Sequence, residues 1–257
     1  MIDLTTLADL TPGICSVTLR EKGIDDVIRI SSEAGLAGIE WGTDVHVSDA
    51  ASAAHAKEAT EEEGMSVLSL GSYYRAGSFD DFDRVLELAI ALGAPRVRIW
   101  AGGTGSAAAT EEDWAAVVED TRRIADLAAA RNVAIAFEYH GNTLTDSPET
   151  TLQLLSRVDH GNVGTYWQPA VGLSDQQALE SLHQVLPHLV GVHCFSWGPE
   201  AERHPLRARK QLWQSVSDVL RGNGKDMDVM LEFVEDDEPE NVLNDAAFLH
   251  GITLGED

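Results

Sequence analysis

The stretch Val133-Ala134-Ile135-Ala136-Phe137-Glu138-Tyr139-His140 decides the fold, because its apolar run ends in a carboxylate, a phenol and an imidazole. This pattern is typical of a buried parallel strand that carries functional groups at its end. Apolar and charged residues alternate with helical spacing over 111–131, and Asp146-Ser147-Pro148-Glu149 then supplies a helix N-cap and a proline for the first turn. Glu138 therefore lies at the C-terminal end of a strand, where parallel α/β folds place their chemistry.

The same unit of a strand followed by a helix recurs along the chain. The predicted strands cover 14–19, 38–41, 67–70, 97–100, 133–140, 163–167, 189–193 and 229–233. The predicted helices cover 25–34, 50–63, 79–92, 111–131, a segment after Pro148, 174–186, 206–220 and 239–249. Regular alternation requires parallel strands joined by crossover helices. Eight units predict an α/β protein of the (β/α)8 TIM barrel type, with residues 1–257 as a single domain.

A doubly wound open sheet is the alternative architecture. The glycine-rich segment Gly102-Gly103-Thr104-Gly105 does not match the dinucleotide-binding pattern G-x-G-x-x-G, and no acidic residue follows a suitable strand at the required distance. We therefore interpret these glycines as a turn. No linker rich in Pro, Gly or Ser divides the chain, which supports one domain.

Composition limits the class of protein and its partners. A hydrophobic content of 44% in 257 residues is enough for a large core, and no apolar run is long enough to cross a membrane. The segment Met1–Leu4 has no basic region followed by an apolar one, so we expect a cytoplasmic protein without a membrane partner. The formal net charge of −25 opposes binding to nucleic acid.

The chain has two cysteines, Cys15 and Cys194, and each lies in an apolar, strand-like run. Two cysteines exclude a disulfide framework, although they leave a single bridge open. We expect both to be small thiols of the core.

The ends of the fifth to eighth predicted strands present Glu138, Gln168, His193 and Glu232. In a barrel, one ligand from each of four strand ends forms a metal site. Two carboxylates, an amide and an imidazole give a mostly oxygen set with a charge of −2, which favours one Mn²⁺, Mg²⁺ or Co²⁺. Zn²⁺ remains compatible with the set, but the set does not favour a structural zinc site.

Each of these residues also has an ordinary structural interpretation. A glutamate at a strand end often forms a salt bridge, a lone histidine after an apolar run is often part of the core, and Gln168 before Pro169 could belong to a turn. Their recurrence on four successive strand ends favours the metal site.

Phe137-Glu138-Tyr139-His140, Val192-His193 and Leu231-Glu232 resemble the xylose isomerase-like superfamily of sugar isomerases and epimerases, and the resemblance extends over essentially the whole chain. In that family, a Glu, an Asp, a His and a Glu bind one divalent cation, and the two glutamates flank the reacting carbon. The resemblance implies metal binding by Glu138, His193 and Glu232 and a catalytic role for both glutamates. Gln168 departs from the family, because it stands where an aspartate is usual.

The implied activity is that of a divalent-metal-dependent isomerase or epimerase of a sugar or sugar phosphate, a small-molecule carbohydrate substrate. The cation would acidify a carbon-bound proton and stabilise an enediolate, while one glutamate removes the proton and the other returns it. A dehydratase or lyase acting on a keto-sugar or an inosose is the alternative enzyme. A catalytically silent barrel that binds carbohydrate is the alternative outside enzymes, because Gln168 weakens cation binding. Apurinic endonuclease activity is disfavoured, and a homo-oligomer is compatible with the sequence.

Further residues at or near strand ends are candidates for substrate contact. His140 lies two residues after Glu138, so it points to the same side if the strand continues. Glu40 could recognise a hydroxyl group. Arg75 and Arg98 could hold a phosphate or carboxylate, although Arg98 could instead form an interior ion pair. Indole rings stack well on sugars or pack in the core, and the indoles in question belong to Trp41, Trp100, Trp167 and Trp197.

Overall fold

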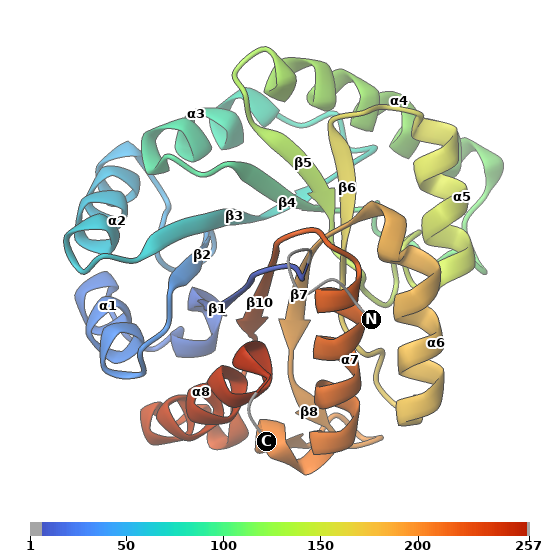
Figure 1. The fold of residues 1–257 in the computed structure, drawn as a ribbon. Helices are drawn as coiled ribbons and strands as arrows, with labels where there is room; N and C mark the ends of the chain where they lie inside the picture. The colour runs from blue at the N-terminus through green and yellow to red at the C-terminus, as the bar shows by residue number, and fades with distance from the viewer. Residues whose placement is uncertain (1–6, 256–257) are drawn as a thin grey trace.

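The structure is a computed structural model, and it describes residues 7–255. Eight parallel strands close into a barrel in the order β1-β10-β7-β6-β5-β4-β3-β2 (Figure 1). These strands are β1 (Leu10–Cys15), β2 (Gly38–Gly42), β3 (Ser66–Arg75), β4 (Arg96–Trp100), β5 (Ala134–Phe137), β6 (Val163–Trp167), β7 (Leu189–Cys194) and β10 (Met227–Leu231). The predicted (β/α)8 TIM barrel is therefore confirmed.

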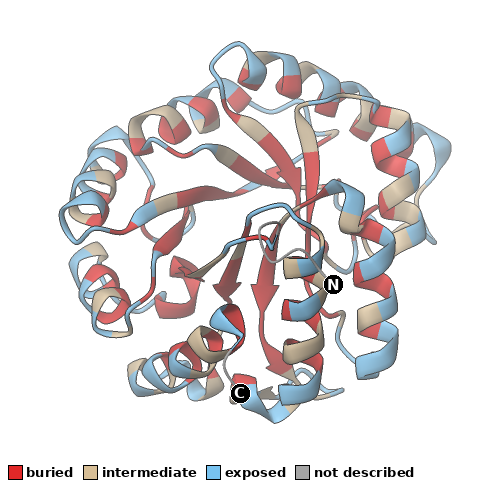
Figure 2. Cartoon of the chain, in the orientation of Figure 1, coloured by how far each residue is buried: buried red, intermediate tan, exposed pale blue. Residues whose placement is uncertain are grey.

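Eight α-helices surround the strands and turn their polar faces outward (Figures 1 and 2). They are α1 (Ile24–Glu33), α2 (Ala50–Glu62), α3 (Phe82–Leu92), α4 (Glu111–Ala129), α5 (Pro148–Val158), α6 (Asp175–Val185), α7 (Lys210–Gly222) and α8 (Pro239–Leu254). The strands are largely buried, because helices cover their outer faces and side chains fill the barrel (Figure 2). None of the helices within residues 7–255 is long and apolar enough to cross a membrane.

Two short strands and four 3-10 helices lie in the segments that connect the barrel strands and the α-helices within residues 7–255. Strands β8 (Ser196–Trp197) and β9 (Arg203–His204) form an antiparallel pair after β7. The 3-10 helices are η2 (Ser16–Leu19), η3 (Leu186–His188), η4 (Leu206–Arg209) and η5 (Glu235–Asp237).

Local sequence signals explain where the helices begin. Ser147 caps α5 by accepting a hydrogen bond from the backbone N–H of Thr150 at 3.2 Å, and Pro148 occupies the first helical turn, as predicted. Thr110 and Asp113 form a reciprocal capping box at the start of α4. Gly102 adopts a φ of 79° between β4 and α4, which confirms the predicted turn.

Several predicted boundaries are wrong, among them those of the first strand and the third helix. The first strand was expected over 14–19, but it ends at Cys15 and the chain then turns into η2. Thr18 in η2 is tied to the end of β10, because its hydroxyl donates to the carbonyl of Leu231 at 3.3 Å and accepts from the backbone N–H of Phe233 at 3.0 Å. The third helix was expected from residue 79 but begins at Phe82, after its cap Asp81.

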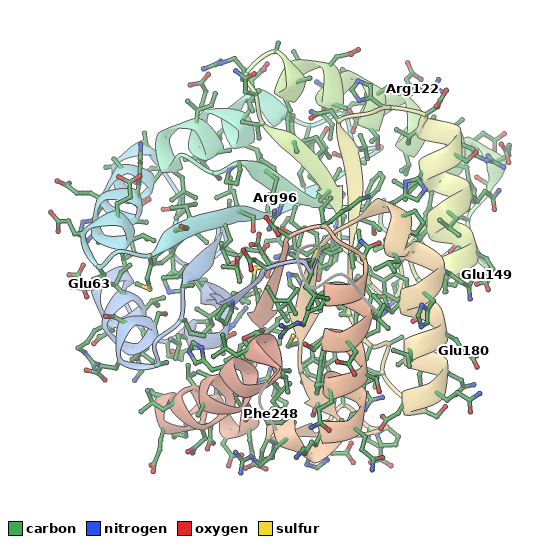
Figure 3. All side chains as sticks on the ribbon, viewed as in Figure 1. Glu63, Arg96, Arg122, Glu149, Glu180 and Phe248 are labelled. Carbon is green, nitrogen blue, oxygen red and sulfur yellow. The ribbon has the colours of Figure 1, made fainter. Side chains whose placement is uncertain are left out.

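The N-terminal half of the barrel interior contains a partly buried ion pair. Arg96 of β4 forms an ion pair with Asp228 of β10, and its Nε donates to the hydroxyl of Tyr166 at 2.9 Å. Figure 3 shows Arg96 within the ring of strands, whereas Glu149 and Glu180 lie on outer helices. We call Arg96, Asp228 and Tyr166 the lower layer. Among the described residues, Cys15 and Cys194 are free buried thiols, as expected.

Candidate active site

The four predicted ligands meet at the C-terminal end of the barrel. Glu138 directly follows β5, Gln168 follows β6, His193 lies in β7 and Glu232 follows β10. Backbone hydrogen bonds fix the two glutamates at the strand ends: the N–H of Glu138 donates to the carbonyl of Ile99 at 2.9 Å, and that of Glu232 to the carbonyl of Cys194 at 3.0 Å.

Their polar atoms converge. One candidate ligand atom each from Glu138, His193 and Glu232 lies within 4.8 Å of the others. The Nδ1 atom of His193 is 3.0 Å from Oε1 of Gln168 and 3.5 Å from Oε2 of Glu232. All four side chains are at most 9% exposed. The structure therefore brings the predicted set together around the ring of His193.

Arg98 joins this set to a third buried carboxylate. Its Nε donates to Oε1 of Glu40 at 2.8 Å, and its Nη1 forms an ion pair with Oε2 of Glu138. Ser69 donates a further hydrogen bond to Glu40 at 2.6 Å. Arg98 is thus the interior ion pair that the sequence left open as its alternative role. We call Arg98, Glu40 and Glu138 the upper layer.

A glycine makes room for this layer. A Cβ atom on Gly71 of β3 would lie 2.8 Å from Nη2 of Arg98 and 2.9 Å from Oε1 of Glu40. Real Cβ atoms do not approach other atoms so closely, so a side chain at this position would displace the guanidinium from the carboxylate. The absence of a side chain at residue 71 is therefore part of the site.

Burial and neighbouring charges both shift the pKa values of the site residues. Burial alone would raise the pKa of Glu40, but the charges of Arg98 and His193 outweigh it and hold that pKa well below its usual range. Burial raises the pKa of Glu232, and the negative charge of Glu138 adds to the rise. For His193, burial lowers the pKa, but Glu232 and Glu40 outweigh it, so the net shift is upward.

The donor set fits a divalent cation. A histidine binds a metal through its neutral ring; with His193 neutral, Glu40, Glu138 and Glu232 carry three negative charges and Arg98 one positive charge, which leaves −2 in a buried space. A buried charge of this size needs compensation, and two positive charges would supply it. Carboxylate and amide oxygens with one imidazole suit Mn²⁺, Mg²⁺ or Co²⁺. The residues that could hold the ion are Glu138, Gln168, His193 and Glu232.

A cavity of about 390 Å³ opens above the four residues. Aromatic side chains form much of its wall, together with the carboxylates of Glu138, Asp146 and Glu232. The aromatic members are Tyr73, Trp100, Tyr139, His140, Phe195, Trp197 and Phe233. An acidic floor under aromatic walls is suited to a small molecule that has both hydroxyl groups and apolar faces.

Four of the predicted substrate contacts line this cavity, namely Arg98, Trp100, His140 and Trp197. Trp100 donates a hydrogen bond from Nε1 to Oε2 of Glu138 at 2.6 Å, and its ring stacks on His140 with 4.7 Å between centroids. The Nδ1 atom of His140 is 2.6 Å from the carbonyl oxygen of Gly141. Because a carbonyl only accepts, Nδ1 carries the proton and Nε2 of the neutral ring is an acceptor.

The other four candidates do not line the cavity. Glu40 lies below it in the upper layer. Arg75 lies over the ring of Trp100 at 4.1 Å and donates to the carbonyl of Gly102. Trp41 packs on the outer face of the barrel, where its Nε1 donates to Thr60 of α2. Trp167 likewise donates to Ser181 of α6, because successive strand residues face opposite sides.

Sequence reasoning did not name four aromatic residues of the cavity wall as site residues, namely Tyr73, Tyr139, Phe195 and Phe233. Phe195 lies two residues after His193, and Phe233 directly follows Glu232. Tyr73 lies near the end of β3, a strand that the sequence pattern made too short. Alternation of side chains was the available signal for Phe195, because residues i and i+2 share one face of a strand.

The comparison with protein families identifies the class of protein. Residues 28–250 match the family described as "Xylose isomerase-like TIM barrel". The chain therefore belongs to this family, as its strand-end residues predicted.

Three similar proteins represent two reactions. A 3-dehydroshikimate dehydratase of Bacillus anthracis is 28% identical over 164 residues, a match that spans 59% of each chain. The crystal structure of the probable 3-DHS dehydratase AsbF from Bacillus anthracis has a TM-score of 0.76 at 18% identity, covering 93% of this chain and 98% of the other. The D-psicose 3-epimerase of Clostridium cellulolyticum H10, solved with D-tagatose, has a TM-score of 0.71 at 14% identity, covering 95% and 98%. The chain is similar to enzymes, and the two structures share its fold.

Proposed function

We propose that this protein is a divalent-metal-dependent isomerase or epimerase of a sugar or sugar phosphate. The observation that carries the proposal is the convergence of Glu138, His193 and Glu232, with Gln168, at the C-terminal end of the barrel, where Glu138, Gln168 and Glu232 line a cavity and His193 is buried beside them. This end is where TIM barrel enzymes place their active sites.

The two glutamates are placed to exchange a proton with the substrate. A bound divalent cation would supply Lewis-acid polarisation of a substrate carbonyl and hydroxyl. Glu138 and Glu232 follow β5 and β10, and β6 and β7 lie between these strands in the barrel, so the carboxylates reach the cavity from different sides. One glutamate would remove the proton beside the carbonyl, and the other would return it to the resulting enediolate.

Other residues would hold these groups in place. Trp100 and Arg98 both engage Oε2 of Glu138, which fixes the orientation of that carboxylate. The rings of Trp100 and Trp197 offer apolar surfaces for a sugar. A fixed carboxylate reacts more efficiently because it need not be reoriented during proton transfer.

Exchange of a carbon-bound proton with deuterated water tests the proposal. Purified protein loaded with Mn²⁺, Mg²⁺ or Co²⁺ should incorporate deuterium into a ketose beside its carbonyl group, as followed by NMR. Metal analysis of the same samples separates this enzyme from a silent carbohydrate-binding barrel, which need not retain a stoichiometric cation. Metal-loaded protein that exchanges no proton in any ketose, ketose phosphate or cyclic ketone would overturn the proposal.

A dehydratase is the second candidate, and the match to the 3-dehydroshikimate dehydratase favours it. An enediolate can expel a β-substituent as well as be reprotonated. His140 would offer a further proton acceptor through Nε2. Mass spectrometry distinguishes the two reactions, because a dehydratase product has lost water whereas an isomerised or epimerised product keeps the mass of its substrate. Cytoplasmic location and any homo-oligomer stay predictions.

A further inference from the structure

We infer that the substrate of this site is electrically neutral, a free keto-sugar or polyol ketone rather than a sugar phosphate or a keto acid. This inference rests on the proposed function and narrows its substrate class. It follows from the charges around the cavity, because within residues 7–255 no Lys or Arg side chain without a carboxylate partner lines its wall.

The cavity wall offers no free cation. Within residues 7–255, Arg98 is the one Lys or Arg side chain that lines the cavity, and its two carboxylate partners already neutralise it. The wall also carries the carboxylates of Glu138, Asp146 and Glu232. With a divalent cation bound, the buried set of Glu40, Glu138, Glu232 and Arg98 is neutral. A phosphate or carboxylate on the substrate would then be an unbalanced charge in a partly desolvated space.

Two arginines lie near residues of the cavity wall but do not line the cavity, and among the described residues Arg75 has no carboxylate partner whereas Arg203 has one. Arg75 lies on the ring of Trp100 and donates to a backbone carbonyl. Arg203 forms an ion pair with Asp237 and lies 4.3 Å from the centroid of the Phe233 ring.

The loops where TIM barrels frequently bind phosphate are acidic in this chain. That position is formed by the loops after the seventh and eighth barrel strands, together with the start of a short extra helix. Here those strands are β7 and β10. The loop after β7 contains Glu200 and Glu202 together with Arg203, which pairs with Asp237, and the short helix η5 after β10 lies in the run Glu235-Asp236-Asp237-Glu238. These carboxylates would repel a phosphate where other barrels bind one. The net charge of −25 also opposes the approach of anions from solution.

Matched pairs of neutral and anionic compounds test the inference. D-Fructose and D-tagatose are compared with their 1- and 6-phosphates, and a neutral inosose is compared with 3-dehydroshikimate, by proton exchange in deuterated water with the metal-loaded protein. We expect kcat/KM for the best neutral compound to exceed that of its anionic partner by about tenfold or more, because like charges placed side by side cost several kcal/mol. Added salt should leave the neutral rate unchanged and raise the anionic rate.

A charge-reversal variant supplies the second measurement. Asp236→Lys in the loop after β10 should raise kcat/KM for the phosphates by about threefold or more and leave the neutral sugars unchanged, because it replaces a repulsive charge with an attractive one. Glu63→Lys makes the same change of charge on an outer surface of the barrel (Figure 3) and should alter neither. Equal effects of the two variants would count against the inference.

Several outcomes separate this inference from the proposed function. If a phosphate or a keto acid exchanges protons as fast as its neutral partner or faster, the substrate is not neutral, although the proposed function survives. If no compound exchanges protons, the proposed function fails, and calorimetric titration of the same pairs then decides the inference. Binding of a neutral compound with no binding of its anionic partner would support it. Binding of the anion, or of neither compound, would overturn it.

Discussion

Two arginines of one strand lie in different surroundings. Arg96 and Arg98 of β4 both point into the barrel, and each forms an ion pair with a carboxylate from another strand. In the lower layer, Arg96 meets Asp228 and Tyr166 near the N-terminal end, and its side chain is 14% exposed. In the upper layer, Arg98 meets Glu40 and Glu138, is 4% exposed, and borders the cavity.

The two layers differ in their position along the barrel axis rather than in the kind of interaction. This position would distinguish a structural ion pair from one that belongs to the candidate site. In both layers a guanidinium group forms an ion pair with at least one carboxylate. The upper layer shares Glu138 with the candidate metal site, whereas the lower layer lies at the end of the barrel that TIM barrel enzymes use for stability. Substitutions in matched positions of the two layers can test this distinction.

The largest expected effect is on catalysis. Glu138→Gln and Glu232→Gln keep the shape and one ligand oxygen of each side chain but remove a proton acceptor. Each should lower the rate of substrate proton exchange by a factor of about 10² to 10⁴ while the protein still folds and binds a sugar. Asp228→Asn, the matched change in the lower layer, should leave the exchange rate within about threefold of the parent protein.

Loss of metal could imitate this result, so occupancy has to be measured in the same samples. A metal-loaded Glu232→Gln variant that exchanges protons at the parent rate would remove Glu232 from the mechanism. It would leave a one-base or hydride-shift route.

The second prediction compares the stability of the layers. Arg98→Met leaves Glu40 and Glu138 buried without their cation, and it should lower the free energy of unfolding by about 3–5 kcal/mol. Arg96→Met should cost less, about 1–2 kcal/mol, because water can reach Asp228, whose side chain is 18% exposed. Urea unfolding followed by circular dichroism measures both, on protein without added metal. Equal losses would show that the two layers do not differ in this way.

The third prediction concerns metal affinity. Gln168→Asp adds a negative charge beside Glu138 and Glu232, which should tighten binding of Mn²⁺ by about tenfold, or about 1.4 kcal/mol. Isothermal titration calorimetry measures the change, and Asp228→Asn serves again as the distant control. Unchanged or weaker binding would indicate that Gln168 contacts substrate or packs at the rim.

The smallest expected effect concerns a buried carboxylate that has no arginine bonded to it. Asp245 of α8 accepts a hydrogen bond from the backbone N–H of Leu206 at 2.9 Å, and burial raises its pKa to about 6. Because the folded pKa lies above the unfolded value of about 3.9, this group stabilises the fold fully below pH 4 and loses that contribution as the pH rises to about 6.

Asp245→Asn cannot ionise but can still accept the hydrogen bond. Between pH 4 and pH 7, the stability of the parent protein should therefore fall by about 1–2 kcal/mol relative to the variant. Urea unfolding at several pH values measures this difference. Parallel pH profiles would show that Asp245 keeps an ordinary pKa in the folded protein.

Most of the fold could be predicted from the sequence, because parallel barrel strands are buried runs whose spacing is set by the helices between them. The strand-end position of Glu138 also follows from local pattern alone. The turn after β1 could not be predicted, because Thr18 is held by residues more than 200 positions away. Local propensity contains no information about such a contact.

The sequence was enough to predict which four residues converge at the candidate site, but it predicted the residues around them less well. Alternation along β2 already indicates that Glu40 and Trp41 face opposite sides, so only one of them could face the barrel interior. Trp41 was nevertheless grouped with Trp100. The ion-pair partner of Arg98 could not be predicted from the sequence, because the pairing with Glu40 depends on which strands are close across the barrel interior.

Gly71 has a consequence for how this protein could be altered. The residue has no functional group and would be passed over when active-site positions are chosen for mutagenesis, yet the guanidinium and carboxylate of the upper layer occupy the space that a methyl group would need. A library that varies the cavity wall to accept new substrates should therefore keep residue 71 fixed. The freedom to redesign the candidate site is limited by a residue that does not line the cavity.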